Sequence, residues 1–481
     1  MWPLTSIANI ASGILGFDSL EAKLANFDPS TDRSFTAISP NEFKKEIWYL
    51  GEGGKVDIQK TKIVEFDKEE DMRQGLFLYA HYNVFGKLLD EDWHQMTVHS
   101  WGYNKKREKW FFEIDFLGEG KDYADLIREE EDPTKIYNML EKIIDKAVLM
   151  EVAAPEFLKD PRKLRKHGAD KAHRGISEYV KSLSADGVQT DVVALRKGLN
   201  TLLDSGILKI ENFFTDSFPG NWIPVNGKPA RIDMDGKQGW FFGNFNAPHI
   251  AEYSSKLSTE QREKLKQHYV TQYNNAVNKY NDYVKTSLAK PKDTVCELID
   301  TYLHLDKERA DALKRKIKYG RNKRNIEDYV KTIEKFEPAL KDKIYMIKNH
   351  LANLKERETI DEEKFEVFYQ ASKLVRALAS CGGKGDRRRK ETDPEKFMYL
   401  YREQRFQLEN AIEAARYLEQ YSGDNMWWFR RSAISKIRAT LEKDYERMYN
   451  QKFKSKKEKQ ADLVANPIRL MPIDYDYAKA A

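Results

Sequence analysis

Residues 258–291 read STEQREKLKQHYVTQYNNAVNKYNDYVKTSLAKP, and this stretch decides how most of the chain folds. Ser258 and Gln261 have the spacing of a capping box, in which each side chain binds a backbone amide at the start of a helix. Pro291 stops a helix because it lacks an amide hydrogen. The stretch therefore predicts an amphipathic helix that buries one face. The large apolar residues recur at helical spacing along that face: Leu265, Tyr269, Tyr273, Val277, Tyr280, Val284 and Leu288.

A run of helix starts and stops follows this stretch, with almost no strand signal. Asp293 and Asp306 are expected N-caps of two short helices, because their side chains can accept hydrogen bonds from free amides. Asp393 followed by Pro394 has the pattern of a further helix start, since proline suits the first turn. We therefore expect a helical bundle or array over residues 251–460.

Strand-like sequence lies upstream of the helices. Residues 102–105, Gly-Tyr-Asn-Lys, are expected to form the turn of an antiparallel hairpin. Along 109–117 apolar and mixed positions alternate, which is typical of a sheet covered on one side. The prediction is an α+β fold, a mixed antiparallel-sheet N-terminal half followed by a mostly α-helical bundle or array. Four segments rich in β-branched and aromatic residues are the expected strands: 56–66, 76–85, 96–101 and 109–117.

These patterns predict five parts in the chain. Its 481 residues are enough for two or three domains with substantial cores. Charged residues make up 33% and aromatic residues 12%, a mixture that suits a surface-rich helical protein better than a compact enzyme. The parts are an apolar N-terminal arm and link (1–40), an antiparallel β-rich domain (41–130), a helical region with a winged-helix-like pattern and a hairpin (131–250), a helical bundle (251–460) and an extended C-terminal tail (461–481).

Residues 176–234 have the element order of a winged helix-turn-helix module. Two expected helices, 176–183 and 190–203, precede an expected hairpin of strands 222–225 and 231–234. In such modules the second helix enters the major groove of DNA. Many of them only pack structurally, so nucleic-acid binding and structural packing both stay open. The residues expected to face a duplex are Thr190, Asp191, Arg196, Lys197, Asn200, Lys228 and Arg231.

Three basic clusters lie in the expected helical bundle. Such clusters can neutralise phosphates of a nucleic acid or bind an acidic protein. They can also be solvent-exposed residues without a partner, because the helix dipole favours cations near helix C-termini. The Gly-rich segment 381–390 is the strongest candidate for a binding site among the three, because a mobile cationic loop has little structural purpose. The clusters contain Arg321, Lys323 and Arg324 with neighbours from Lys314 onward; Arg387, Arg388, Arg389 and Lys390 in segment 381–390; and the lysines of residues 452–459.

Both ends of the chain carry apolar segments. Residues 1–17 contain no charge, and they are expected to dock on their own domain, on a neighbouring subunit or on a membrane interface. The segment 466–481 cannot continue a helix past Pro467 and Pro472, so it is expected to lie extended against a partner. The expected contact residues are Trp2, Leu4, Ile7, Ile10, Ile14 and Leu15 in the first segment and Ile468, Leu470, Met471 and Ile473 in the second.

No catalytic signature is present in the sequence, and no cofactor or metal site is expected. His81, His94 and His99 lie near several carboxylates along the chain, but sequence spacing alone does not bring them together. The two cysteines, Cys296 and Cys381, fit a reducing compartment and exclude a disulfide framework. No apolar run reaches the length of a membrane-spanning helix.

Taken together, these patterns predict a non-enzymatic structural protein that contacts neighbouring subunits through its apolar terminal arms. It would form a homo- or hetero-oligomer within a larger complex, such as a particle or a secretion machine, in the cytoplasm or in the assembled particle. The alternative is a nucleic-acid-binding protein that uses the winged-helix-like region and the basic segment 381–390. A second alternative is an enzyme whose site the sequence does not reveal.

Overall fold

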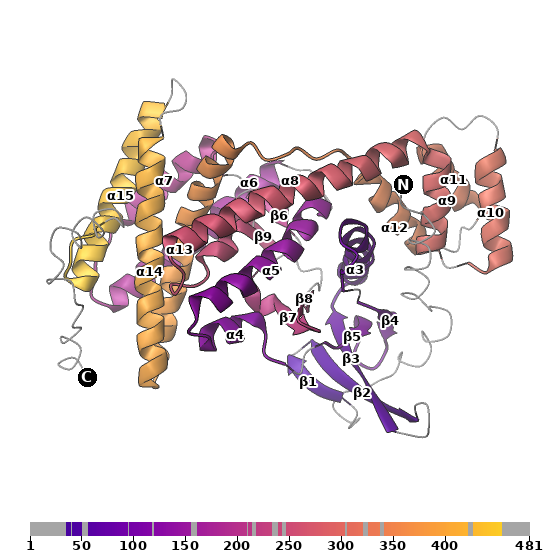
Figure 1. Ribbon diagram of the computed structural model, residues 1–481, viewed down its shortest axis with the longest axis horizontal. Helices are drawn as coiled ribbons and strands as arrows, with labels where there is room; N and C mark the ends of the chain where they lie inside the picture. The colour runs from indigo at the N-terminus through magenta and orange to yellow at the C-terminus, as the bar shows by residue number, and fades with distance from the viewer. Residues whose placement is uncertain are drawn as a thin grey trace. The chain divides into compact units, whose positions relative to one another are not determined.

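A computed structural model describes fourteen stretches of the chain. They confirm the α+β layout, because an antiparallel sheet in the N-terminal half precedes a long series of helices (Figure 1). The described residues fall into two compact units, the first within Met1–Leu164, Glu211–Phe241 and Phe245–Glu362, and the second within Arg165–Ile210, Phe242–Asn244 and Glu363–Ala481. The described stretches are 35–39, 41–50, 56–94, 96–117, 120–154, 161–208, 210–213, 218–232, 239–242, 247–303, 305–320, 326–336, 341–421 and 427–454.

The first unit contains a five-stranded antiparallel sheet with the order β1-β2-β3-β5-β4. Strand β3 has the predicted bounds, whereas the turn between β4 and β5 lies at residues 105–108, not at 102–105. The residues Phe111, Phe112, Glu113 and Ile114 are all buried, so β5 is covered on both faces and not on one. The strands are β1 (Phe35–Ser39), β2 (Glu42–Leu50), β3 (Val56–Phe66), β4 (Val98–Asn104) and β5 (Lys109–Asp115).

Helix α3 (Glu69–Leu89) covers one face of this sheet, and the predicted strand 76–85 is therefore wrong (Figure 1). The ring of Tyr79 lies edge-on to Phe112 of β5, with 5.5 Å between ring centroids. Every residue from Leu76 to Phe85 is buried, with no exposed face. A helix that is buried all round shows no helical period, and a short apolar run then looks the same as a buried strand.

Two long helices pack together beside the sheet region, α5 (Pro133–Ala153) and α8 (Thr259–Ala289). The predicted capping box of α8 is confirmed, since Gln261 N donates to Ser258 Oγ at 3.1 Å and Ser258 N donates to Gln261 Oε1 at 2.9 Å. The buried Tyr269 of α8 donates a hydrogen bond to Glu151 of α5 at 2.8 Å. This contact ties the two helices together through a polar group within their shared core.

Smaller elements complete the first unit. The hairpin of β7 (Trp222–Val225) and β8 (Lys228–Arg231) packs on α5, and a short helix α4 (Tyr123–Glu129) precedes α5. Asp306 is confirmed as an N-cap, but Asp293 is not: Lys290 occupies the cap and Pro291 the first turn. The remaining helices are α9 (Pro291–Tyr302), α10 (Lys307–Tyr319), α11 (Ile326–Phe336) and α12 (Lys341–Ala352), with 3-10 turns at Pro219–Asn221 and Ala247–Glu252.

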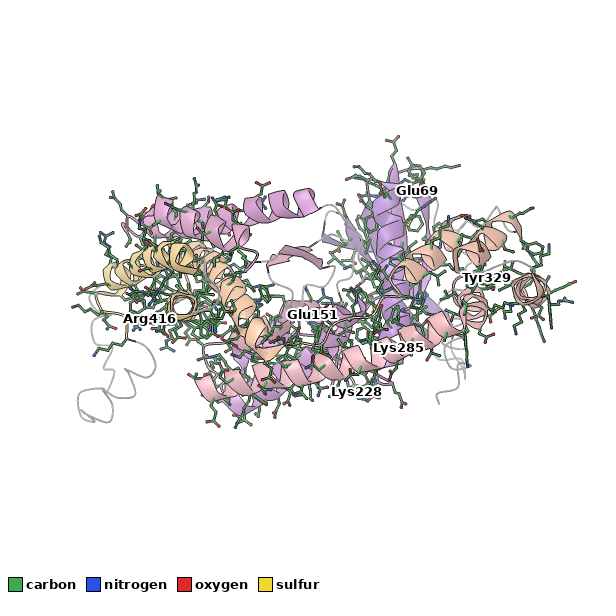
Figure 2. All side chains as sticks on the ribbon, turned by 90° about the horizontal axis from the view of Figure 1, so that it is seen from above. Glu69, Glu151, Lys228, Lys285, Tyr329 and Arg416 are labelled. Carbon is green, nitrogen blue, oxygen red and sulfur yellow. The ribbon has the colours of Figure 1, made fainter. Side chains whose placement is uncertain are left out.

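The second unit is helical. Its apolar core joins α7, α13, α14 and α15 through residues such as Leu199, Leu374, Ile412 and Ile437. Arg416 on α14 donates from Nε to Glu442 on α15 at 2.8 Å, which adds a polar contact at the rim (Figure 2). The helices are α6 (Pro161–Ala185), α7 (Val192–Asp204), α13 (Glu362–Lys390), α14 (Pro394–Gln420) and α15 (Trp427–Tyr449). The strands β6 (Ile210–Phe213) and β9 (Gly239–Phe242) pair with each other, and most of their residues belong to the first unit.

The predicted mobile loop at 381–390 is wrong, because helix α13 continues through it to Lys390. A Cβ atom on Gly382 would lie 2.6 Å from the backbone of α6 at Glu178 and Tyr179. A Cβ atom on Gly385 would lie 2.0 Å from the hydroxyl of Ser182. These glycines are therefore required for the close approach of α13 and α6, which outweighs their low helix propensity.

Candidate functional site

The interior strands of the sheet hold their buried carboxylates in closed networks. Glu113 on β5 is 2% exposed, and it accepts hydrogen bonds from the hydroxyls of Thr61 at 2.5 Å and Ser100 at 2.9 Å. Glu65 on β3 is 3% exposed and accepts two hydrogen bonds from one edge of the Arg107 guanidinium, from Nε at 2.6 Å and from Nη2 at 2.9 Å. A buried carboxylate needs such partners to offset its desolvation. These groups link neighbouring strands of the sheet to each other.

The edge strands of the same sheet have a different composition. Strand β1 reads FTAIS and β4 reads VHSWGYN, and neither contains Lys, Arg, Asp, Glu or Pro, although 33% of the chain is charged. Ile38 on β1 is 48% exposed and Tyr103 on β4 is 39% exposed. Within the described stretches, no further strand pairs with the outer side of either edge. Proteins usually protect such edges with charges or prolines, because unpaired backbone groups accept another strand.

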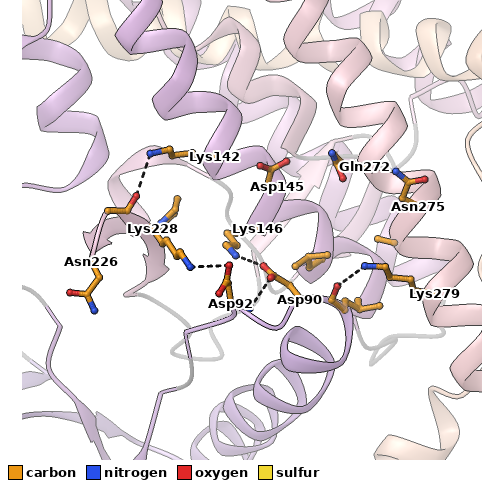
Figure 3. Close-up of a pocket in the computed structure, with 15 residues that line it drawn as sticks. Asp90, Asp92, Lys142, Asp145, Lys146, Asn226, Lys228, Gln272, Asn275 and Lys279 are labelled. Atoms are coloured by element: carbon orange, nitrogen blue, oxygen red, sulfur yellow. Dashed lines mark hydrogen bonds and ion pairs between the residues drawn. The ribbon is translucent and has the colours of Figure 1, made fainter. Parts of the chain in front are cut away.

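A pocket of about 560 Å³ opens in the first unit between α5, α8, the β7–β8 hairpin and the end of α3 (Figure 3). Its volume is in the usual range for a small-molecule site, but its lining is more polar than most. Amide side chains of Asn226, Gln272 and Asn275 also reach it. The charged residues of the lining are Lys142, Lys146, Lys228 and Lys279 together with Asp90, Asp92 and Asp145.

Two ion pairs fix the floor of this pocket. Lys146 on α5 pairs with Asp90, the residue that ends α3. Lys228 on the hairpin pairs with Asp92 at 2.8 Å, and the amide of Asp92 donates to the carboxylate of Asp90 at 2.9 Å. The short segment after α3 is therefore held from two sides by lysines of different elements.

The other two lysines bind backbone oxygens. Lys142 donates to the carbonyl of Gly227 at 3.4 Å, and Lys279 donates to the carbonyl of Leu89 at 3.2 Å. In the part of the chain that the structure describes, neither ammonium group has a carboxylate partner. They approach the pocket from opposite sides, one beside the hairpin turn and one beside the end of α3 (Figure 3).

The sequence did not predict this pocket, although the hairpin turn that lines it has a clear sequence pattern. Asn226 and Gly227 form the turn of the β7–β8 hairpin with φ angles of 52° and 76°. Asn-Gly is the strongest two-residue hairpin signal, because both positions need a positive φ. The predicted second strand 231–234 is therefore placed too late, since β8 begins at Lys228. The lysines carry no such signal, because they come from elements far apart in the sequence.

The three predicted histidines do not form one cluster. His81 lies on α3, where it donates to the carbonyl of Ala153 at 2.5 Å, and burial lowers its pKa to about 4. His99 on β4 binds Asp115 at 2.7 Å, and burial lowers the pKa of His94 in the loop between α3 and β4. No group of three or more His, Cys, Asp or Glu side chains among the described residues could hold a metal ion.

A second buried histidine, which the sequence reading did not single out, lies next to His81. The rings of His81 and His350 are 6.1 Å apart, and His350 stacks on Phe85 with 5.0 Å between centroids. Burial lowers the pKa of His350 to about 3, and the positive form of His81 lowers it further. Tyr283 donates a hydrogen bond to His350 at 3.2 Å. Both imidazoles are therefore neutral core groups at neutral pH.

The cations predicted in a loop at 381–390 lie at the end of helix α13, and most of them bind groups of the second unit. Arg387 is exposed, and it alone of the four makes no hydrogen bond or ion pair with another described residue. The other three stabilise the end of α13 and its contact with α6. Arg388 pairs with Asp186 at 2.7 Å, Arg389 donates to the backbone oxygen of Ser182 at 3.0 Å, and Lys390 pairs with Asp386 at 2.8 Å.

The winged-helix-like pattern is divided between the two units. Helix α7 belongs to the second unit, whereas the hairpin with Lys228 and Arg231 belongs to the first. Thr190 points inward and donates to the buried carboxylate of Asp444 at 2.5 Å. Asp191 caps α7 by accepting from the amide of Ala194 at 3.0 Å. Arg196, Lys197 and Asn200 are exposed on α7, and Arg231 is buried against the Trp222 ring at 5.4 Å.

Several predicted contact residues lie outside the described stretches. These are Arg321, Lys323 and Arg324, and all residues named in the two terminal arms, from Trp2 to Leu15 and from Ile468 to Ile473. Among the helices that the structure describes, none is long and apolar enough to cross a membrane. A comparison of the chain with protein-family models and with curated proteins finds no match.

Proposed function

We propose that this chain is a non-enzymatic assembly protein, which contacts neighbouring subunits through apolar terminal segments within a larger complex such as a particle or a secretion machine. The observation that carries the proposal is the absence of charge and proline from both edge strands of the sheet, β1 and β4. An edge of this kind accepts an extended segment through main-chain hydrogen bonds, and its side chains add apolar contact.

The interior strands indicate that the uncharged edges are not a property of the whole sheet. Strand β2 reads EFKKEIWYL, β3 reads VDIQKTKIVEF and β5 reads KWFFEID, so each contains both acidic and basic residues. Charges on an edge strand normally prevent unwanted pairing. Their absence at the two edges and presence between them support edges that are built to pair.

The proposed occupant is the C-terminal segment of a neighbouring copy. Residues 473–477 read IDYDY, so Ile473, Tyr475 and Tyr477 alternate with two aspartates. That period of two is the pattern of a strand with one apolar and one solvated face. The segment lies outside the described residues, and its sequence fits an added strand at an uncharged edge. The aspartates would limit continued growth of the sheet, because like charges on neighbouring strands repel.

Deleting the segment tests this function. The variant that lacks residues 466–481 is expected to lose its oligomers in size-exclusion light scattering, while its helix content by circular dichroism stays unchanged. A variant that lacks residues 1–17 tests the second arm in the same way. Oligomers of unchanged mass in both variants would count decisively against the proposal.

Nucleic-acid binding stays as a second candidate because of one observation on helix α7. Val193, Arg196, Lys197 and Asn200 are exposed on one face of that helix, and Val193 is 76% exposed. Cations spaced along an exposed helix can contact phosphates and make binding salt-dependent. An Arg196→Glu/Lys197→Glu variant is expected to lose any affinity for duplex DNA measured at low salt. Equal binding by this variant and the native chain, or no binding by either, would remove the second candidate.

A further inference from the structure

The lysine-lined pocket contains no residue of the sheet edges, and the proposed assembly does not make use of it. Its walls come from α5, α8, the β7–β8 hairpin and the end of α3, all within the first unit. Four separate elements thus bring lysines or carboxylates to one cavity of about 560 Å³. Grouping four ammonium groups in one place is unfavourable unless anions offset their mutual repulsion.

Carboxylates offset only part of this charge. Lys146 and Lys228 have Asp90 and Asp92 as partners. Asp145, the third carboxylate, accepts a hydrogen bond from Nε2 of His268 at 2.6 Å, and this bond raises the pKa of His268. The charges of Lys142 and Lys279 are then left with backbone carbonyls alone. The pocket therefore presents two cations that an external anion can neutralise.

The position of these two cations sets the kind of anion. Lys142 lies beside the hairpin turn and Lys279 beside the end of α3, so they flank the cavity and do not meet at one point (Figure 3). A ligand with one anionic group at each end would satisfy both. Lysine is a point charge with three donors and is a common phosphate ligand, whereas arginine is favoured where a carboxylate or a phosphate is bound through two parallel hydrogen bonds. The described lining contains lysine and no arginine.

The remaining polar groups of the pocket indicate the chemistry of the ligand between its two anionic ends. Asn226, Gln272 and Asn275 offer amide donors and acceptors, and the lining aspartates are acceptors that suit hydroxyl groups. Leu89, Leu149 and Ala276 add only a small apolar area for an aromatic ring. We propose that this pocket binds a small bisphosphorylated polyol, with one phosphate held by Lys142 and the other by Lys279.

Calorimetric titration of the full chain with fructose 1,6-bisphosphate, fructose 6-phosphate and fructose tests the proposal. We expect saturable binding of one bisphosphate per chain, binding of the monophosphate weaker by roughly tenfold or more, and none of the unphosphorylated sugar. A bisphosphate that fails to bind, or that binds no better than fructose, would overturn the proposal. A poly-glutamate peptide that binds in place of the bisphosphate would indicate an acidic protein partner and also overturn it.

Paired lysine variants then locate the binding. Lys142→Ala/Lys279→Ala is expected to weaken bisphosphate binding by roughly a hundredfold, at about tenfold for each lost charge-assisted contact. Lys135→Ala/Lys264→Ala removes two lysines from the same helices, α5 and α8, outside the pocket, and is expected to bind as the native chain does. The single variants Lys142→Gln and Lys279→Gln repeat the test with less change in the fold. Equal weakening by the pocket pair and the control pair would contradict the site.

Discussion

The edge strands and the interior strands of the five-stranded sheet differ in their charged residues. Inside the sheet, Glu113 is surrounded by Thr61, Ser100 and the ammonium group of Lys45 at 3.4 Å, so its charge is compensated by neighbouring strands. At the edges, β1 and β4 carry no charged residue that would oppose a further strand. The difference teaches that charge inside this sheet is compensated by neighbouring strands, whereas the two edge strands carry no charge, which is the feature that the proposed assembly would use.

The largest effect is expected when charge is placed on the edges. Ile38→Lys/Tyr103→Lys is expected to weaken association of the chain by roughly a thousandfold, because each lysine must lose its hydration when a strand is added. The free energy of unfolding should change little, since both side chains are partly exposed. Light scattering over a range of protein concentrations measures the association.

A matched control separates this effect from a general change in surface charge. Val193→Lys/Tyr319→Lys places two lysines at side chains of helices α7 and α10 that are 76% and 78% exposed. This control is expected to associate as the native chain does. If both pairs of substitutions weaken association equally, the edges have no special role.

The next largest effect is expected in the interior, and on stability only. Glu113→Ala removes the shared acceptor of Thr61 and Ser100 and the ion pair with Lys45. Breaking a buried network of this kind costs about 3 kcal/mol of unfolding free energy. Urea denaturation measures the loss, and Lys105→Ala in the exposed turn is the control. If Glu113→Ala weakened association as much as it lowers stability, the proposed difference between edge and interior strands would be contradicted.

Acid is expected to weaken the helix layer behind the sheet. The folded-state pKa of His81 is about 4, below the value of about 6.5 for the unfolded chain, so the unfolded chain takes up the proton first as pH falls. The contribution of His81 is therefore present above pH 6.5 and lost as pH falls toward 4, by about 3 kcal/mol. His350, with a pKa of about 3, acts in the same direction. Urea midpoints that do not change between pH 7 and pH 4.5 would contradict this reading.

The smallest effect is expected at the exposed rim of the sheet. Lys109 at the start of β5 pairs with Asp67, and the carboxylate side chain is 75% exposed. Exposed pairs of this type contribute about 0.5 kcal/mol, because water screens them. Lys109→Met is therefore expected to shift the urea midpoint slightly and to leave association unchanged. A loss as large as that of Glu113→Ala would mean that charge at the rim also holds the sheet together.

The sequence predicted elements that have their own local signals. The bounds of β3, the capping box at Ser258 and the cap at Asp306 follow from neighbouring residues alone, and each is confirmed. Helix α3 could not be recognised in this way, because burial on every side removes the period that distinguishes a helix from a strand. The helix through Gly382 also depends on a distant segment, since only the nearby backbone of α6 explains why glycine is tolerated there.

The candidate sites also differ in how far they depend on local sequence or on contacts between distant segments. The composition of the edge strands can be read from the sequence, but which strands form the edges requires the sheet order, where β5 lies between β3 and β4. The pocket depends on longer separations still, because Lys142 and Gly227 are 85 residues apart and Lys279 and Leu89 are 190 apart. Tertiary packing brings such groups together, and no short-range pattern encodes it.

Amide hydrogen exchange at low and high protein concentration tests the central claim most directly. If the edges pair with a neighbouring copy, amides of β1 (Phe35–Ser39) and β4 (Val98–Asn104) will exchange more slowly at high concentration, together with those of residues 473–477. Amides of β3, which is paired on both sides in the single chain, will show no such dependence. Exchange at β1, β4 and 473–477 that is independent of concentration, in a protein that forms oligomers, would contradict assembly through the sheet edges.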